Sequence, residues 1–240
     1  MTKPIILAIQ NDETDPPHLA GVWLQEFGFT IQVIKAYEGE SVPSAVPQGI
    51  AGLLPLGGHM GALDDHVADW LPNERALLND AVTRGIPIFA ICLGAQLLAE
   101  ATGGKISRAE EGEIGIYSID LTAEGVDDPV FDIETGSIVA QWHEDLVSTL
   151  PPSAVRLASS PLCPNQIYRI GTTTYAVQFH PEIDTSIITN WEANADNAFI
   201  ESGKQTVEPE MAAAEAELIR IWKPVIQNWA QLVMNEIGKK

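Results

Sequence analysis

The sequence predicts an α/β protein built on an open, mostly parallel β-sheet with helices on both faces. In the first half, short apolar segments alternate with segments of helical length and pattern. The apolar segments run continuously, which is typical of parallel strands buried on both faces. After Gly103 the chain changes to short strand-like segments separated by Gly, Pro and Asp, and we expect several of these strands to be antiparallel.

Strands and helices are expected to alternate through the first half of the chain. The expected strands are residues 4–10, 29–37, 49–58 and 86–91, and the expected helices are residues 16–28, 70–84 and 93–101. The first helix begins with two prolines and ends at Gly28, the usual asymmetry of helix ends. The second helix is stopped by Gly85 and Pro87.

The second half is expected to hold strands and a helical tail. The expected strands are residues 113–121, 137–143, 154–160, 165–171 and 174–180. A tail at about 207–237 is expected to be helical, and residues 1–240 are read as a single domain. One stripe of this tail is apolar and comprises Met211, Ala214, Leu218, Ile221, Val225, Trp229 and Leu232. The stripe fits packing onto the chain's own sheet, or a dimer or partner surface.

Charge and cysteine content exclude several classes of function. The formal net charge is −20, from 33 acidic and 13 basic residues, so nucleic acid and anionic membranes should repel the chain. No segment is apolar over the length of a membrane span or has the form of a signal sequence. The two cysteines form no disulfide framework, which favours the reducing cytoplasm.

Cys92 lies where an apolar strand meets a helix, in the segment AICLGAQ. Ala90 and Gly94 are small neighbours of the kind that a nucleophile on a sharp strand-to-helix turn requires. The N-terminus of the following helix would stabilise a thiolate and an oxyanion. A lone cysteine after an apolar strand also fits a buried core residue, so this segment alone leaves both readings open.

His180 and Glu182 supply what a cysteine nucleophile needs. His180 ends an apolar strand in VQFHPE, and strand ends are where sites form in open α/β sheets. Residues two apart in an extended segment point the same way, so Glu182 is placed to orient the imidazole. Together with Cys92 they predict a Cys–His–Glu triad. Cys163 is expected to be structural, and the histidines lack metal-ligand spacing, so no metal and no cofactor is expected.

AICLGAQ followed by VQFHPE resembles the class I glutamine amidotransferase domain, whose fold is flavodoxin-like. That family has Gly-x-Cys-x-Gly-x-Gln and, near its C-terminus, His-Pro-Glu. LPLGGHMG and EEGEIGIYSI are also similar to family segments, and the resemblance extends from the first strand to about Trp191. The chain is most similar to the amidotransferase half of GMP synthase and to stand-alone proteins like it.

This resemblance implies hydrolysis of the glutamine γ-carboxamide through a cysteinyl thioester, releasing glutamate and ammonia. Cys92 would be the nucleophile, His180 the acid and base, and Glu182 its orienter. The N–H groups of Leu93 and of the glycine turn, with Gly58 favoured over Gly57, would form the oxyanion hole. Substrate-binding positions implied by the family motifs are Gln96, Trp142 and His143.

Three departures from the family pattern bear on the substrate. Ala90 replaces a glycine and His59 a proline, while Trp142 and Glu144 stand where similar domains have Ser and Gly. The last change leaves open a γ-glutamyl peptidase or hydrolase that acts on conjugates. The same fold could also serve as a non-catalytic regulatory or binding subunit. With no phosphate-binding loop in the chain, ammonia would pass to a separate synthetase or acceptor subunit, and an oligomer is possible.

Overall fold

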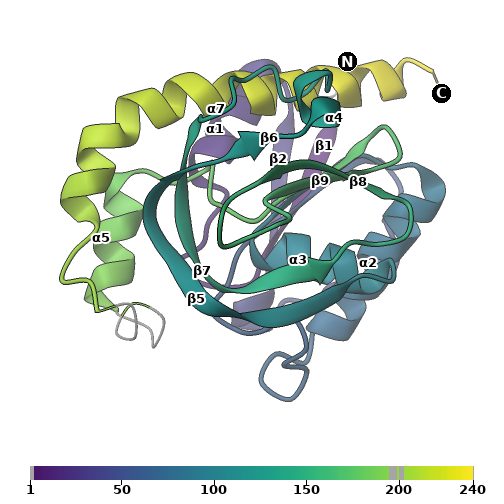
Figure 1. Cartoon of the computed structure of the whole chain (residues 1–240). Helices are drawn as coiled ribbons and strands as arrows, with labels where there is room; N and C mark the ends of the chain where they lie inside the picture. Colours follow the sequence, from purple (N-terminus) through teal and green to yellow (C-terminus); the bar gives the residue numbers. More distant parts are fainter. Residues whose placement is uncertain (1–2, 195–198, 200–202, 240) are drawn as a thin grey trace.

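A computed structural model describes residues 3–194, 199 and 203–239 and confirms the predicted fold class (Figure 1). The strands of the main sheet follow the order β2-β1-β3-β4-β10-β9-β8-β6. The first five of these strands are parallel, and β9, β8 and β6 continue the sheet antiparallel. Their bounds are β1 (Ile5–Gln10), β2 (Thr30–Lys35), β3 (Ile50–Pro55), β4 (Ile88–Ile91), β6 (Asp120–Leu121), β8 (Ala154–Ser159), β9 (Ile167–Ile170) and β10 (Thr174–Val177).

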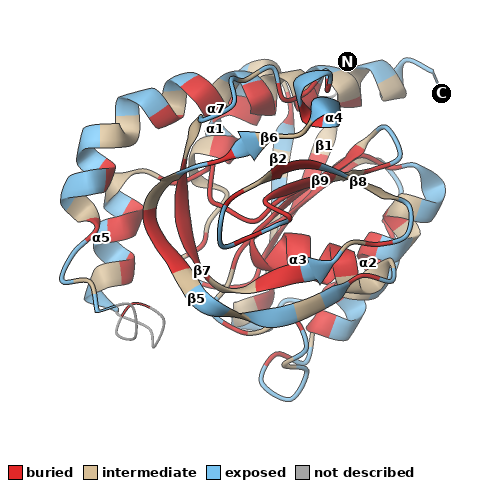
Figure 2. Cartoon of the chain, in the orientation of Figure 1, coloured by how far each residue is buried: buried red, intermediate tan, exposed pale blue. Residues whose placement is uncertain are grey.

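Helices cover both faces of the sheet because its central strands are apolar on both sides. In β1, Ile6 and Ala8 face one core, and Leu7 and Ile9 face the other. The first core is closed by α1 (His18–Phe27) and α7 (Glu208–Ile237), and the second by α2 (Leu71–Arg84) and α3 (Leu93–Ala101). Figure 2 shows the buried residues concentrated where helices and sheet meet. Shorter elements are η1 (Ala36–Glu38), α4 (Ala123–Val126) and α5 (Thr185–Ala193).

The apolar stripe of α7 packs onto the chain itself. Met211 and Trp229 are fully buried, and Trp229 meets Phe89 of β4 edge-on with ring centroids 5.8 Å apart. Trp222 Nε1 donates a hydrogen bond to the Ile138 carbonyl oxygen (3.0 Å). The packing interpretation of the stripe is therefore confirmed. Within the described ranges, no helix has the length and hydropathy to cross a membrane.

A long antiparallel ribbon curls over one end of the main sheet (Figure 1). It pairs β5 (Lys105–Ser118) with β7 (Ile138–Thr149). β5 begins before and β7 ends after the predicted ranges, and the predicted strand 113–121 is divided between β5 and β6. The early part of β5 is mostly polar and exposed, so its sequence lacks the alternation of apolar and polar residues that is typical of a strand. Its pairing with β7 shifts between Arg108 and Glu113. The His180 N–H donates to the Ala140 carbonyl oxygen (2.9 Å), which ties the ribbon to the end of β10.

Candidate active site

Cys92 lies in a tight turn between β4 and α3. Its backbone has φ 50° and ψ −110°, an uncommon conformation for a residue other than glycine. The Cys92 N–H donates to the Val177 carbonyl oxygen (2.9 Å). A Cβ atom at Gly94 would lie 2.4 Å from the Pro55 carbonyl oxygen, so only glycine allows α3 to pack this closely on β3. The turn thus holds the Cys92 side chain at the carboxyl edge of the sheet, where it lines a pocket.

His180 and Glu182 form a buried pair beside Cys92. His180 Nδ1 lies 2.7 Å from Glu182 Oε1, and the side chains are only 2% and 1% exposed. Burial alone would lower the pKa of His180, but the carboxylate of Glu182 and the sulfur of Cys92 raise it well above its ordinary value. The edge of Trp191 packs against the imidazole, with ring centroids 4.9 Å apart. Glu182 and Cys92 therefore favour the imidazolium form of His180.

The two N–H groups expected in an oxyanion hole are both available. Leu93 is the first residue of α3, and Gly58 follows β3 in the glycine turn that lines the pocket. Within the described chain, neither N–H donates to another protein group. A Cβ atom at Gly58 would lie 2.8 Å from Met60 Sδ and 3.0 Å from Leu93 Cδ2, so a larger residue would displace this turn.

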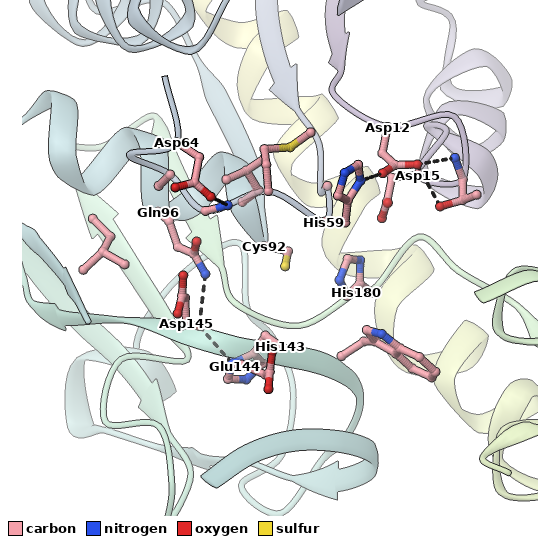
Figure 3. Close-up of a pocket in the computed structure, with 18 of the residues that line it drawn as sticks. Asp12, Asp15, His59, Asp64, Cys92, Gln96, His143, Glu144, Asp145 and His180 are labelled. Atoms are coloured by element: carbon pink, nitrogen blue, oxygen red, sulfur yellow. Dashed lines mark hydrogen bonds and ion pairs between the residues drawn. The ribbon is translucent and has the colours of Figure 1, made fainter. Parts of the chain in front are cut away.

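The pocket extends to both sides of Cys92 and has a volume of about 760 Å³. Figure 3 shows Gln96, His143, Glu144 and Asp145 on one side of the sulfur, and His180, Asp15, Asp12 and His59 on the other. The pocket is lined by residues of the β1 and β3 loops, of α3, of the β5–β7 ribbon and of the segment from His180 to Asn194. Pockets of this size hold ligands larger than a single amino acid.

The three predicted substrate-binding residues all line this pocket. Gln96 Nε2 donates to the Asp145 carbonyl oxygen (3.0 Å), and His143 Nδ1 lies 3.1 Å from the same oxygen. Trp142 is stacked on Phe199, with ring centroids 5.2 Å apart, and contacts Trp191 at 5.3 Å. Gln96 therefore ties α3 to the β7 backbone, His143 contacts the backbone of its own strand, and Trp142 forms an apolar wall of the pocket.

Three polar residues of the site were not predicted from the sequence. Gln178 Nε2 points to Cys92 Sγ at 3.7 Å. Asp12 follows β1 and pairs with His59; burial favours its neutral form, but hydrogen bonds from His59 and Thr14 lower its pKa to about 2. Burial raises the pKa of Asp15 to about 7, against the attraction of His180. The signal for both aspartates was present, because they follow a central parallel strand at its carboxyl end.

Two buried groups of side chains have the spacing of metal ligands, which the sequence did not predict. In the first group, the potential ligand atoms lie within 4.8 Å of one another and belong to Asp15, His180 and Glu182. The second group meets the same limit and consists of Glu113, His143 and Cys163. In the second group, protein partners already surround the carboxylate of Glu113. Ser160 Oγ donates to Oε1 (2.7 Å), Gln166 Nε2 donates to Oε2 (2.8 Å), and His143 Nε2 lies 3.2 Å from Oε2.

Cys163 differs from Cys92 in its surroundings. It is completely buried, and burial raises the pKa of its thiol to about 12. Its thiol therefore stays protonated at neutral pH and is a poor nucleophile. This agrees with the structural role predicted for it.

Comparison with known proteins gives the class of the protein. The family described as "Glutamine amidotransferase class-I" matches residues 24–207, and the chain belongs to this family. The chain is 33% identical over 171 residues to the glutamine amidotransferase-like protein YfeJ of Salmonella typhimurium, covering 69% of this chain and 70% of YfeJ. It is also 31% identical over 165 residues to the glutamine-hydrolysing GMP synthase of Wolinella succinogenes, but this match spans only 30% of that relative's length.

Solved structures show the same fold. A glutamine amidotransferase from Thermotoga maritima has a TM-score of 0.83 at 25% identity, covering 97% of this chain and 99% of that one. The protein SMU.1228c has a TM-score of 0.84 at 25% identity, with coverage of 96% and 99%. The predicted fold and family resemblance are therefore confirmed.

Proposed function

We propose that this protein hydrolyses the γ-amide bond of glutamine or of a γ-glutamyl amide through a cysteinyl thioester. The observation that carries the proposal is the placement of Cys92 on a strained turn beside the buried His180–Glu182 pair. A core cysteine needs neither the left-handed backbone nor a buried imidazole–carboxylate pair next to its sulfur. Membership of the glutamine amidotransferase family supports the same chemistry.

In the first half of the proposed reaction, His180 takes the proton of the Cys92 thiol, and the sulfur attacks the γ-carbonyl carbon. The carbon–sulfur bond forms as the carbonyl electron pair moves to oxygen, and the N–H groups of Leu93 and Gly58 stabilise the oxyanion. When the oxyanion collapses, the carbon–nitrogen bond breaks and His180 gives its proton to the leaving nitrogen. Ammonia or an amine departs, and a glutamyl thioester remains on Cys92.

In the second half, water attacks the thioester carbon and His180 accepts its proton. A second tetrahedral oxyanion forms at the same N–H groups and collapses with cleavage of the carbon–sulfur bond, which releases glutamate. Glu182 keeps His180 in the tautomer that presents Nε2 to the reacting atoms and stabilises the imidazolium. Gln96 and His143 would bind the amino-acid end of the substrate on the side of Cys92 away from His180, and Trp142, which contacts Trp191, would form an apolar wall of the substrate site.

The size of the pocket favours γ-glutamyl conjugates as a second class of substrate for the same reaction. A volume of about 760 Å³ leaves room beyond glutamine, which supports a γ-glutamyl conjugate. For glutamine itself we propose that a separate subunit accepts the ammonia. Relatives named as glutamine-hydrolysing GMP synthases support this use of glutamine, although the matches span only 19% to 30% of their length.

The test is to follow glutamate release from glutamine and from a panel of γ-glutamyl amides, with Cys92→Ser as the matched control. We expect turnover of at least one substrate and its loss in the variant. Turnover that survives in Cys92→Ser would refute the mechanism. Hydrolysis of conjugates without glutamine would select the second substrate class.

A further inference from the structure

Asp15 places a buried carboxyl group inside the pocket, with an oxygen within 4.8 Å of a ring nitrogen of His180. The residue is 7% exposed and lines the pocket beside His180. No donor among the described residues hydrogen-bonds this carboxylate. The neighbouring Asp12 differs, because its carboxylate is bound by His59 and by the Thr14 N–H (2.8 Å) and Oγ1 (2.9 Å). Burial without a partner disfavours the carboxylate form of Asp15, and a cationic ligand group would stabilise that form.

The position of Asp15 identifies which part of the substrate it would meet. A Cβ atom at Gly57 would lie 2.7 Å from Asp15 Oδ1 and 2.9 Å from His180 Cε1, so these two atoms flank the same glycine. A general acid must reach the leaving nitrogen, which therefore lies between Cys92 and His180. Any group attached to that nitrogen continues along the pocket on the His180 side, where Figure 3 shows Asp15.

Both ends of the pocket carry acidic residues. Arg108 of the β5–β7 ribbon lines the far end, where its guanidinium is 2.6 Å from Glu144 and 3.9 Å from Asp145, so these two carboxylates already balance its charge. The Asp15 end suits a positive charge, which would gain a charge-assisted hydrogen bond there. The net charge of −20 also attracts cations to the molecule.

We propose that Asp15 forms a leaving-group subsite for a cationic amine, so that the preferred substrates are γ-glutamyl amides of diamines or polyamines. This inference rests on the proposed hydrolysis of γ-glutamyl amides. Reaction at Cys92 releases the amine, with His180 supplying the proton to the nitrogen of the broken amide bond. The distal ammonium of the amine contacts the Asp15 carboxylate before and during this step.

The experiment compares two substrates of equal length, mono-γ-glutamyl-diaminobutane, which ends in an ammonium, and γ-glutamyl-pentylamide, which ends in a methyl group. We expect the wild-type enzyme to favour the cationic substrate in kcat/KM by about tenfold or more, the effect of one hydrogen bond to a charged group. Asp15→Asn should bring this ratio close to one. Asp132→Asn removes an exposed carboxylate outside the pocket and should leave the ratio unchanged.

A second measurement needs no variant. Because burial raises the pKa of Asp15 to about 7, the wild-type preference for the cationic substrate should increase as pH rises through this value. The charged groups facing Asp15 are Asp12 and His59 on one side and His180 and Glu182 on the other. Their effect on the reacting groups is common to both substrates and cancels in the ratio, and Asp12, whose pKa is about 2, keeps its charge throughout this pH range.

Three results would overturn the inference. One is a wild-type ratio near one, and another is an unchanged ratio in Asp15→Asn. A third is an equal fall in kcat/KM for both substrates in Asp15→Asn, which would make Asp15 a positioning residue for His180. Turnover of the neutral amide or of glutamine in these cases would leave the proposed function standing. If wild-type protein hydrolyses none of the substrates, the proposed function fails and the inference fails with it.

Discussion

Replacing Glu182 with glutamine tests how much the buried pair contributes to catalysis. The change removes the negative charge 2.7 Å from His180 Nδ1 while keeping the size of the side chain. Since both partners are almost fully buried, loss of one charge leaves the imidazolium uncompensated, at a cost of about 3–5 kcal/mol. At about 1.4 kcal/mol per factor of ten, kcat should fall by roughly two to four orders of magnitude.

The assay is steady-state glutamate release, accompanied by the pH dependence of kcat. Because Glu182 raises the pKa of His180, activity that requires the imidazolium should be lost at lower pH in Glu182→Gln than in the wild type. Glu26→Gln is the matched control, since Glu26 is half exposed and pairs with Lys223 (2.8 Å) on the surface. Wild-type kcat in folded Glu182→Gln would refute the assigned role of this carboxylate.

Three further predictions concern packing, buried charge and thiol reactivity. Gly94→Ala should lower the free energy of unfolding by about 1–3 kcal/mol in denaturant titrations, because its Cβ would lie 2.4 Å from the Pro55 oxygen; unchanged stability would contradict this packing. Burial raises the pKa of Glu74 from 4.5 to about 8, so the folded state binds the extra proton and stability falls as pH rises through this window. Glu74→Gln should remove this slope and stabilise the protein at pH 7 by up to about 3 kcal/mol, and an equal slope in both proteins would contradict it. Iodoacetamide should modify Cys92 long before Cys163 in peptide mapping, because the Cys163 thiol is buried with a pKa of about 12; the reverse order would contradict the assignment.

The proximity of Cys92 and His180 could be predicted because parallel strands end at the same edge of a sheet. Strands β4 and β10 are neighbours and pair Ile91 with Val177, so the residues that follow them emerge side by side. The two-residue spacing of His180 and Glu182 is likewise local information. These parts of the site depend on strand ends and motifs, which the sequence displays directly.

Other parts of the site depend on contacts between distant segments. Asp15 is buried only because the loop after β1 packs against Gly57 and the segment that carries Trp191, whose Nε1 donates to the Thr14 carbonyl oxygen (3.0 Å). The Glu113–His143 pair depends on the β5–β7 register and on the irregularity between Arg108 and Glu113. Neither the register nor the irregularity leaves a periodic pattern in the sequence. The single-domain interpretation of residues 1–240 stays a prediction.

The most direct test of the central claim is to trap the covalent intermediate. The protein is mixed with a substrate that it turns over, quenched in acid during steady state, digested and mapped by mass spectrometry. A glutamyl thioester is expected on the peptide that contains Cys92, with none on Cys163 and no adduct in Cys92→Ser. Turnover without any adduct at Cys92, or with undiminished rate in Cys92→Ser, would contradict the proposed mechanism.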